Sequence, residues 1–342
     1  MKALIYEGPR QMVVREVDSP IPAKDEVLIE VAYSGICGSE LSGYLGKNSL
    51  RKPPLIFGHE FSGLIIALGD STADIHRGIR IGTRVTANPL VTCGSCRYCR
   101  QGMEQLCVDR QLLSASLPGS NAAYVKVPVR CVHSIPDHVS LEQGALTEPI
   151  ACAVRAVDLG RVSSQTEALV VGMGPIGLFI VQVLQANGVQ RIIVADTNAE
   201  RLEYARTLGA KTIQPLEVDM VEAVKSMTQG QGADVVFDAV GSSVTRNACV
   251  HSVMSGGTVI MVGLHEADSL LPINHMIRKE IQCIGSFAYA SSHFEQALRW
   301  ISEGKTGLNK GVVTAPLAEG AMWYDRLLTQ PGAITKVLLS PS

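Results

Sequence analysis

Three features that many proteins rely on are scarce in this sequence. Aromatic residues number 6 Phe, 8 Tyr and 2 Trp among 342 residues, and charged residues make up 18%. Lys plus Arg total 30 against 32 for Asp plus Glu, so the formal net charge of −2 argues against a protein that binds nucleic acid or a membrane surface through bulk charge. The longest apolar run, residues 168–181, is broken by three glycines and a proline and is too short to span a bilayer. We therefore expect neither nucleic acid nor membrane as a partner.

The N-terminal segment also has no recognisable export signal. Its first ten residues, MKALIYEGPR, end their apolar run at Glu7 and Pro9, before a signal region could form. We therefore expect a cytoplasmic protein. In a reducing compartment, the nine cysteines should be metal ligands or core thiols rather than disulfides.

The length of 342 residues predicts two domains, and an apolar content of 46% predicts a folded chain. Residues 1–150 contain short apolar runs separated by Gly/Pro turns, which is typical of a β-rich domain. Residues 151–287 alternate strand and helix patterns, which predicts a parallel sheet flanked by helices, and residues 288–342 are expected to rejoin the first domain. The alternating region has expected strands at 168–171, 191–195, 234–238, 258–262 and 281–285, and expected helices at 175–186, 199–208 and 221–227.

A glycine-rich turn follows the first strand of the alternating region. The segment 172–177 reads G-x-G-x-x-G between a buried strand and an apolar-faced helix, the context in which a helix N-terminus binds a pyrophosphate. Asp196 ends the next strand, 19 residues after Gly177, where a carboxylate would accept hydrogen bonds from an adenosine ribose and repel a 2′-phosphate. This favours NAD over NADP, although Arg201 could meet a phosphate. A glycine turn in a flavodoxin-like or methyltransferase sheet is the alternative. The candidate dinucleotide residues are Gly172, Gly174, Pro175, Ile176, Gly177, Asp196 and Arg201.

Four cysteines lie in one fifteen-residue segment: Cys93, Cys96, Cys99 and Cys107. Four thiolates at this spacing suit a closed tetrahedral zinc site, which has no open position for substrate and is therefore structural. An iron–sulfur cluster and ordinary core thiols are the alternatives. The other cysteines with apolar neighbours, Cys131, Cys152, Cys249 and Cys283, are expected to be packing residues.

A second set of metal-ligand residue types is spread over the first domain. Cys37 lies on a glycine-flanked turn, His59 follows 22 residues later, and Glu148 precedes the alternating region. A cysteine, a histidine and a carboxylate form a mixed zinc set that leaves a position for water or substrate. Each of these residues alone is more often an ordinary core or surface residue.

Together these motifs resemble those of the zinc-containing medium-chain alcohol dehydrogenases, over essentially the whole chain. The resemblance rests on Gly35-Ile36-Cys37-Gly38-Ser39, Gly58-His59-Glu60-Phe61-Ser62-Gly63, the cysteine quartet, Glu148-Pro149 and the glycine turn with Asp196. It implies an α/β fold class, with a GroES-like β-rich catalytic domain and a Rossmann doubly wound parallel-sheet domain. The glutamate at 148 resembles the polyol (sorbitol-type), threonine and sugar-alcohol-phosphate branch.

The resemblance also implies roles for individual residues. Cys37 and His59 would bind catalytic zinc together with the carboxylates Glu60 and Glu148, and either of these could ligate directly. Ser39 would accept the proton of the alcohol, and Val262 and Gly263 match the strand that lines the nicotinamide. The implied cofactors are NAD and two zinc ions, one catalytic and one structural, and the implied assembly is a homodimer or homotetramer.

Two positions depart from the family pattern beside Cys37. Ser42 stands where the family often has the histidine that ends the proton relay, and Glu40 stands where an aspartate is usual. Water or a ribose hydroxyl could complete the relay instead. A nearby basic run, Lys47, Arg51 and Lys52, is expected to be solvated surface rather than a phosphate site.

We therefore expect a zinc-dependent enzyme that transfers hydride between NAD and a secondary alcohol, such as a polyol, a sugar alcohol or its phosphate. One alternative is a zinc-free NADPH quinone or enoyl reductase of the same fold. The other is a non-catalytic dinucleotide-binding protein.

Overall fold

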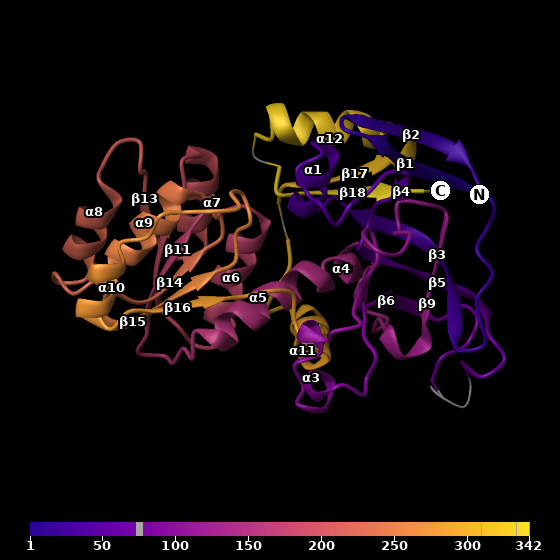
Figure 1. The fold of residues 1–342 in the computed structure, drawn as a ribbon, viewed down its shortest axis with the longest axis horizontal. Helices are drawn as coiled ribbons and strands as arrows, with labels where there is room; N and C mark the ends of the chain where they lie inside the picture. Colours follow the sequence, from indigo (N-terminus) through magenta and orange to yellow (C-terminus); the bar gives the residue numbers. More distant parts are fainter. Residues whose placement is uncertain (73–77, 309, 333, 342) are drawn as a thin grey trace. The chain divides into compact units, whose positions relative to one another are not determined.

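The computed structural model describes residues 1–72, 78–308, 310–332 and 334–341. The chain divides into two compact units: Met1–Glu148 with Tyr289–Ser342, and Pro149–Ala288 (Figure 1). The second unit is therefore an insertion in the first. No helix among the described residues has the length and apolar character needed to cross a bilayer.

The first unit is built around a seven-stranded sheet. Its path runs β10-β6-β5-β3-β18-β17, and β9 also pairs with β3. β18 pairs antiparallel with β3, so the C-terminal segment is part of this unit. These strands are β3 (Glu26–Gly35), β5 (Glu60–Leu68), β6 (Arg84–Ala87), β9 (Tyr124–Pro128), β10 (Val132–Ser134), β17 (Val312–Pro316) and β18 (Lys336–Ser340).

Two small sheets complete the first unit. The sheet β2-β1-β4 comprises β1 (Lys2–Gly8), β2 (Gln11–Glu16) and β4 (Leu55–Ile56). The other pairs β7 (Leu90–Val91) with β8 (Gln111–Leu112) and so closes the loop that carries the cysteine quartet. The helices of this unit are α1 (Gly38–Tyr44), α3 (Arg97–Arg100), α4 (Leu141–Ala145), α11 (Ser291–Ser302) and α12 (Gly320–Thr329), with short turns η1 (Glu104–Leu106), η2 (Val129–Cys131) and η3 (Leu317–Glu319).

Five aromatic residues gather in one core of the first unit. Tyr6, Tyr44, Phe57, Trp323 and Tyr324 belong to the same buried cluster, with Tyr6 and Phe57 stacked at 4.9 Å between ring centroids. Large side chains from the two ends of the chain thus bury one another, which holds β1, α1 and α12 together.

The second unit is a six-stranded parallel sheet in the order β13-β12-β11-β14-β15-β16. The strand order reverses between β11 and β14, the switch point at which doubly wound sheets bind ligands. Its strands are β11 (Glu167–Val171), β12 (Arg191–Ala195), β13 (Lys211–Ile213), β14 (Ala233–Asp238), β15 (Val253–Met261) and β16 (Gln282–Gly285). Its helices are α6 (Pro175–Ala186), α7 (Ala199–Thr207), α8 (Met220–Met227), α9 (Ser243–Ser252) and α10 (Ile273–Lys279), and α5 (Thr147–Leu159) leads into it.

The predicted α/β fold class is confirmed; β13 and α10 were not predicted, and one expected strand is placed differently. The expected strand at 258–262 is β15, which begins earlier, at Val253, and ends at Met261. Gly256 and Gly257 have the composition of a turn, but the structure continues the strand through them with a register shift against β14. Two adjacent glycines are compatible with a β-bulge within a strand as well as with a loop.

Candidate functional site

The first candidate site gathers Cys37, His59 and Glu60, whose ligand atoms lie within 4.8 Å of one another. Strand pairing brings them together, because β3 and β5 are in register at Gly35 and Glu60, and Cys37 follows the end of β3. Gly58 precedes His59 with φ +101, where a Cβ atom would meet Ser34 Oγ, Ser120 Oγ and the Asn121 amide. A larger residue could not make this turn without displacing its neighbours.

Glu40 holds the ring of His59. Its Oε1 lies 2.6 Å from His59 Nδ1 and also accepts hydrogen bonds from Gly58 N and Ser114 Oγ at 2.8 and 2.7 Å, while Tyr324 Oη donates to Oε2 at 2.9 Å. Burial opposes ionisation of Glu40, but the charge and hydrogen bond of His59, the charge of Arg51 and the hydrogen bond from Ser114 lower its pKa to about 2. A carboxylate on Nδ1 fixes the ring and leaves Nε2 for a metal.

Glu60 forms a buried ion pair with Lys336 of β18. Lys336 Nζ lies 2.6 and 2.9 Å from the two carboxylate oxygens of Glu60 and donates to Ile36 O at 3.2 Å, and both side chains are at most 3% exposed. Burial opposes the charge on Lys336, but the facing Glu60 outweighs it and raises the pKa of the ammonium group.

Glu148 lies at the start of α5 and accepts a hydrogen bond from Tyr289 Oη at 2.9 Å. Burial, followed by the nearby charge of Glu60, raises its pKa to about 7 against the opposing effect of His59. Cys37 and His59 share the 4.8 Å cluster with Glu60, and among the described residues Glu148 is not a member of that cluster.

Ser39 and Arg51 lie beside the sulfur of Cys37. Ser39 Oγ donates to Cys37 Sγ at 3.3 Å and accepts from Arg51 Nη2 at 3.1 Å. The expectation that the whole basic run is solvated surface is wrong for Arg51, which is only 5% exposed, whereas Lys47 and Lys52 are exposed. Arg51 folds inward because a hydroxyl and the face of Phe57, 5.9 Å from its guanidinium carbon, lie within its reach.

The ligand types in this cluster fit a divalent cation. The acidic side chains Cys37, Glu40, Glu60 and Glu148 outnumber the basic side chains Lys336, Arg51 and His59. Thiolate, imidazole and carboxylate are also the ligand types that zinc prefers.

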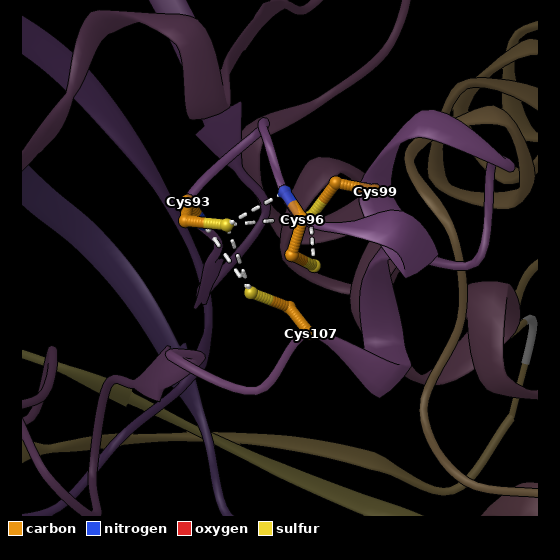
Figure 2. Close-up of side chains that lie close together, drawn as sticks. All are labelled: Cys93, Cys96, Cys99 and Cys107. Atoms are coloured by element: carbon orange, nitrogen blue, oxygen red, sulfur yellow. Dashed lines mark hydrogen bonds between the residues drawn. The ribbon is translucent and has the colours of Figure 1, made fainter.

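The second candidate site is the cysteine quartet, whose sulfurs point toward one another (Figure 2). Within the quartet, the sulfur–sulfur distances are 3.5 Å for Cys107–Cys93, 3.6 Å for Cys96–Cys99 and 4.0 Å for Cys93–Cys99. Four sulfurs in a tetrahedron about 2.3 Å from one zinc would lie about 3.8 Å apart, so the quartet fits a single ion. Hydrogen bonds from the Ser95 and Cys96 backbone lower the pKa of Cys93 to about 6, which favours the thiolate.

The second unit carries the predicted dinucleotide residues at the carboxyl ends of its central strands. Gly172 follows β11 with φ +91, and a Cβ atom on Gly177 would collide with the carbonyl oxygen of Gly172, so this tight approach requires glycine. Asp196 Oδ2 accepts from Met173 N at 2.6 Å, which ties the glycine turn to the end of β12. Arg201 Nη1 lies 3.8 Å from the same oxygen.

The other candidate residues follow the carboxyl ends of β11 and β15. Gly174 is the N-cap of α6, and Pro175 and Ile176 form its first turn. Val262 and Gly263 follow β15, and their amides donate to Asp238 O at 3.0 and 2.9 Å.

Sequence reasoning missed several residues of the first site, among them Ser114, Tyr324 and the buried position of Arg51. Lys336 and Tyr289 carried no local signal, and Glu40 was noted only as a departure from the family pattern. Lys336 and Tyr289 could not be assigned from the sequence, because each contacts a carboxylate that is more than a hundred residues away in the chain.

Comparison with known proteins agrees with this architecture. The family model "Alcohol dehydrogenase GroES-like domain" matches residues 23–137, and "Zinc-binding dehydrogenase" matches residues 175–303. Sorbitol dehydrogenase of Halalkalibacterium halodurans is 34% identical over 100% of this chain and 99% of its own. D-arabitol-phosphate dehydrogenase of Enterococcus avium is 31% identical over 96% of this chain and 94% of its own.

Solved structures with the same fold hold dinucleotides. An Escherichia coli alcohol dehydrogenase in complex with NADH has a TM-score of 0.91 and 29% identity, and each chain is 99% covered. A zinc-binding dehydrogenase from Sinorhizobium meliloti bound to NADP has a TM-score of 0.90, also with 29% identity and 99% coverage of each chain. The chain belongs to the zinc-binding alcohol dehydrogenase family, and it is an oxidoreductase. The predicted family membership is thereby confirmed.

Proposed function

We propose that this enzyme oxidises a secondary hydroxyl of a polyol, a sugar alcohol or its phosphate with NAD, and catalyses the reverse reduction. The observation that carries the proposal is the cluster of Cys37, His59 and Glu60 with the Ser39 hydroxyl beside it, on a chain that also has the dinucleotide turn. Relatives that act on sorbitol and on arabitol phosphate support the substrate class. We propose that the two units are the catalytic and the NAD-binding domain.

Cys37, His59 and a carboxylate would hold the catalytic zinc, with Glu60 favoured over Glu148 because its oxygens lie with the other ligand atoms. Zinc, when bound, polarises the alcohol oxygen and lowers the pKa of its proton. The quartet of Cys93, Cys96, Cys99 and Cys107 would hold the structural zinc. Metal ligation requires the thiols to stay reduced, and this supports a cytoplasmic location.

The protein's own groups then orient the substrate. Ser39 Oγ keeps a free lone pair beside Cys37 and accepts a hydrogen bond from the reacting hydroxyl. Glu40 holds the tautomer and orientation of His59. The bound nicotinamide would supply the hydride acceptor, and the hydroxyl proton would pass by way of Ser39 Oγ to water. The Asp196 carboxylate favours NAD because its charge would repel a 2′-phosphate, with Arg201 as the opposing influence.

A substrate panel with both cofactors tests the proposal. Sugar alcohols, their phosphates, threonine and simple secondary alcohols would be assayed with NAD and NADP in parallel, and zinc would be measured by atomic emission. We expect turnover of a polyol with NAD and two zinc ions per chain, one at each cluster. Cys37→Ser should lose turnover and one zinc while keeping its circular dichroism spectrum. Active protein without zinc, or equal rates with both cofactors, would contradict the metal or the NAD assignment respectively.

We also propose a homodimer or homotetramer joined through the edge of the second unit's sheet. β16 is the edge strand, and α10 beside it exposes Ile273 and Ile277, 56% and 67% accessible, together with Leu270 at 91%. An apolar patch next to an unpaired strand edge is a favourable surface for self-association. Light scattering of Ile277→Asp should show a smaller species than the parent protein, and an unchanged mass would count against this interface.

A further inference from the structure

Among the described residues, the buried guanidinium of Arg51 has one hydrogen-bonding partner. It is 5% exposed, yet no carboxylate of the described residues lies within ion-pair distance of its guanidinium. Its Nε is buried with no acceptor in the described part of the chain, and Nη2 donates to Ser39 Oγ at 3.1 Å. Burying a guanidinium without an ion pair costs folding free energy. The position of Arg51 is therefore better explained by a role in function than by a contribution to stability.

The surrounding chain is shaped to hold Arg51 in this position. Gly43 of α1 leaves room for it, because a Cβ atom there would lie 2.5 Å from Arg51 Cδ. Asn48 closes the preceding turn: its carbonyl accepts from Arg51 N at 3.2 Å, and its side-chain amide donates to Ser39 O at 3.4 Å. The backbone of residues 48–51 is therefore tied to Ser39, the residue that the guanidinium contacts.

We propose that Arg51 is a positioning residue that fixes the Ser39 hydroxyl for the reacting alcohol; this rests on the proposed function. A guanidinium only donates hydrogen bonds, so Ser39 Oγ must accept from Arg51 and direct its own hydrogen elsewhere. That hydrogen points to Cys37 Sγ at 3.3 Å. With both interactions in place, one lone pair of Ser39 Oγ is left, and its direction is set for an incoming hydroxyl.

This arrangement also removes one route for the proton. Arg51 has no lone pair and cannot take a proton from Ser39, and Ser42 replaces the histidine that often ends the relay in the family. Ser39 therefore orients the alcohol and does not pass its proton outward through residue 51. The competing explanation is that Arg51 only balances the buried charge of Glu40, whose pKa it helps to lower.

A double-mutant cycle separates these explanations. Arg51→Met, Ser39→Ala and the double variant would be compared in the zinc-loaded enzyme, with Lys52→Met, an exposed neighbouring cation, as the matched control. We expect Arg51→Met to lower kcat about ten- to a hundredfold with the KM for NAD unchanged. Arg51→Lys should recover part of this loss, and Arg51→Met should cause no further loss in the Ser39→Ala background. An equal loss in both backgrounds would overturn the proposal, because Arg51 would then act without Ser39.

Two readouts do not depend on turnover. A crystal structure of Arg51→Met should show Ser39 Oγ rotated away from Cys37 Sγ, and an unmoved hydroxyl would refute the positioning role. Zinc content and melting temperature should stay near those of the parent protein. A fall in both for Arg51→Met, equal with and without Ser39, would instead support the charge-balancing explanation. If the parent protein oxidises no alcohol, the proposed function fails, while the crystallographic comparison still tests the contact.

Discussion

Removing the ammonium group of Lys336 should destabilise the first unit strongly. Lys336→Met keeps the length of the side chain but leaves Glu60 as a buried carboxylate without its ion-pair partner, and it also frees Ile36 O. Breaking a buried pair from one side costs about 3–5 kcal/mol, because the remaining charge is not solvated. The same substitution at Lys126, which pairs with Glu26 at 2.8 Å but is 41% exposed, should cost less than about 1 kcal/mol.

The assay is urea unfolding of the metal-free protein followed by tryptophan fluorescence. Both tryptophans, Trp300 and Trp323, belong to the first unit, so the signal reports the unit that contains Lys336. Adding Glu60→Gln to Lys336→Met should recover most of the lost free energy of unfolding, since neither charge then remains. Equal losses for Lys336→Met and Lys126→Met, or no recovery in the double variant, would refute the reasoning from burial.

Three further predictions concern the metal sites and the pH dependence. Glu40→Gln should weaken zinc binding by about 10–100-fold in a chelator competition, because the His59 ring loses its charged partner; unchanged affinity would contradict that role. Glu148 has a pKa raised to about 7, so the folded state holds its proton more tightly than the unfolded state. The free energy of unfolding of metal-free protein should therefore fall by about 3 kcal/mol as pH rises from about 4.5 to about 7, and Glu148→Gln should flatten that slope in urea titrations at several pH values. Cys96→Ser should release one zinc and lower the melting temperature, while a Cys131→Ser control, outside the quartet, should keep the zinc content of the parent.

Local patterns in the sequence were sufficient where the interacting residues are close in the chain. The quartet spans fifteen residues, and its sulfurs do converge. The glycine turn joins one strand to the helix that follows it, so its steric requirement can be predicted without tertiary information. The central strands β11, β12 and β14 were predictable because they are largely buried on both faces and read as apolar runs. The start of β15 could not be predicted, because glycines 256 and 257 are equally compatible with a bulge inside a strand and with a turn before it.

The sequence by itself thus determined the fold class, the dinucleotide turn and the cysteine quartet, because these depend on neighbours along the chain. Only the tertiary structure decided which groups surround Cys37. Lys336 reaches Glu60 from 276 residues away, and Tyr289 reaches Glu148 from 141 residues away. Arg51 was expected at the surface, and the space left by Gly43 lets it fold inward. Burial makes each of these contacts strong, and burial is a property of the packed units that no short stretch of sequence encodes.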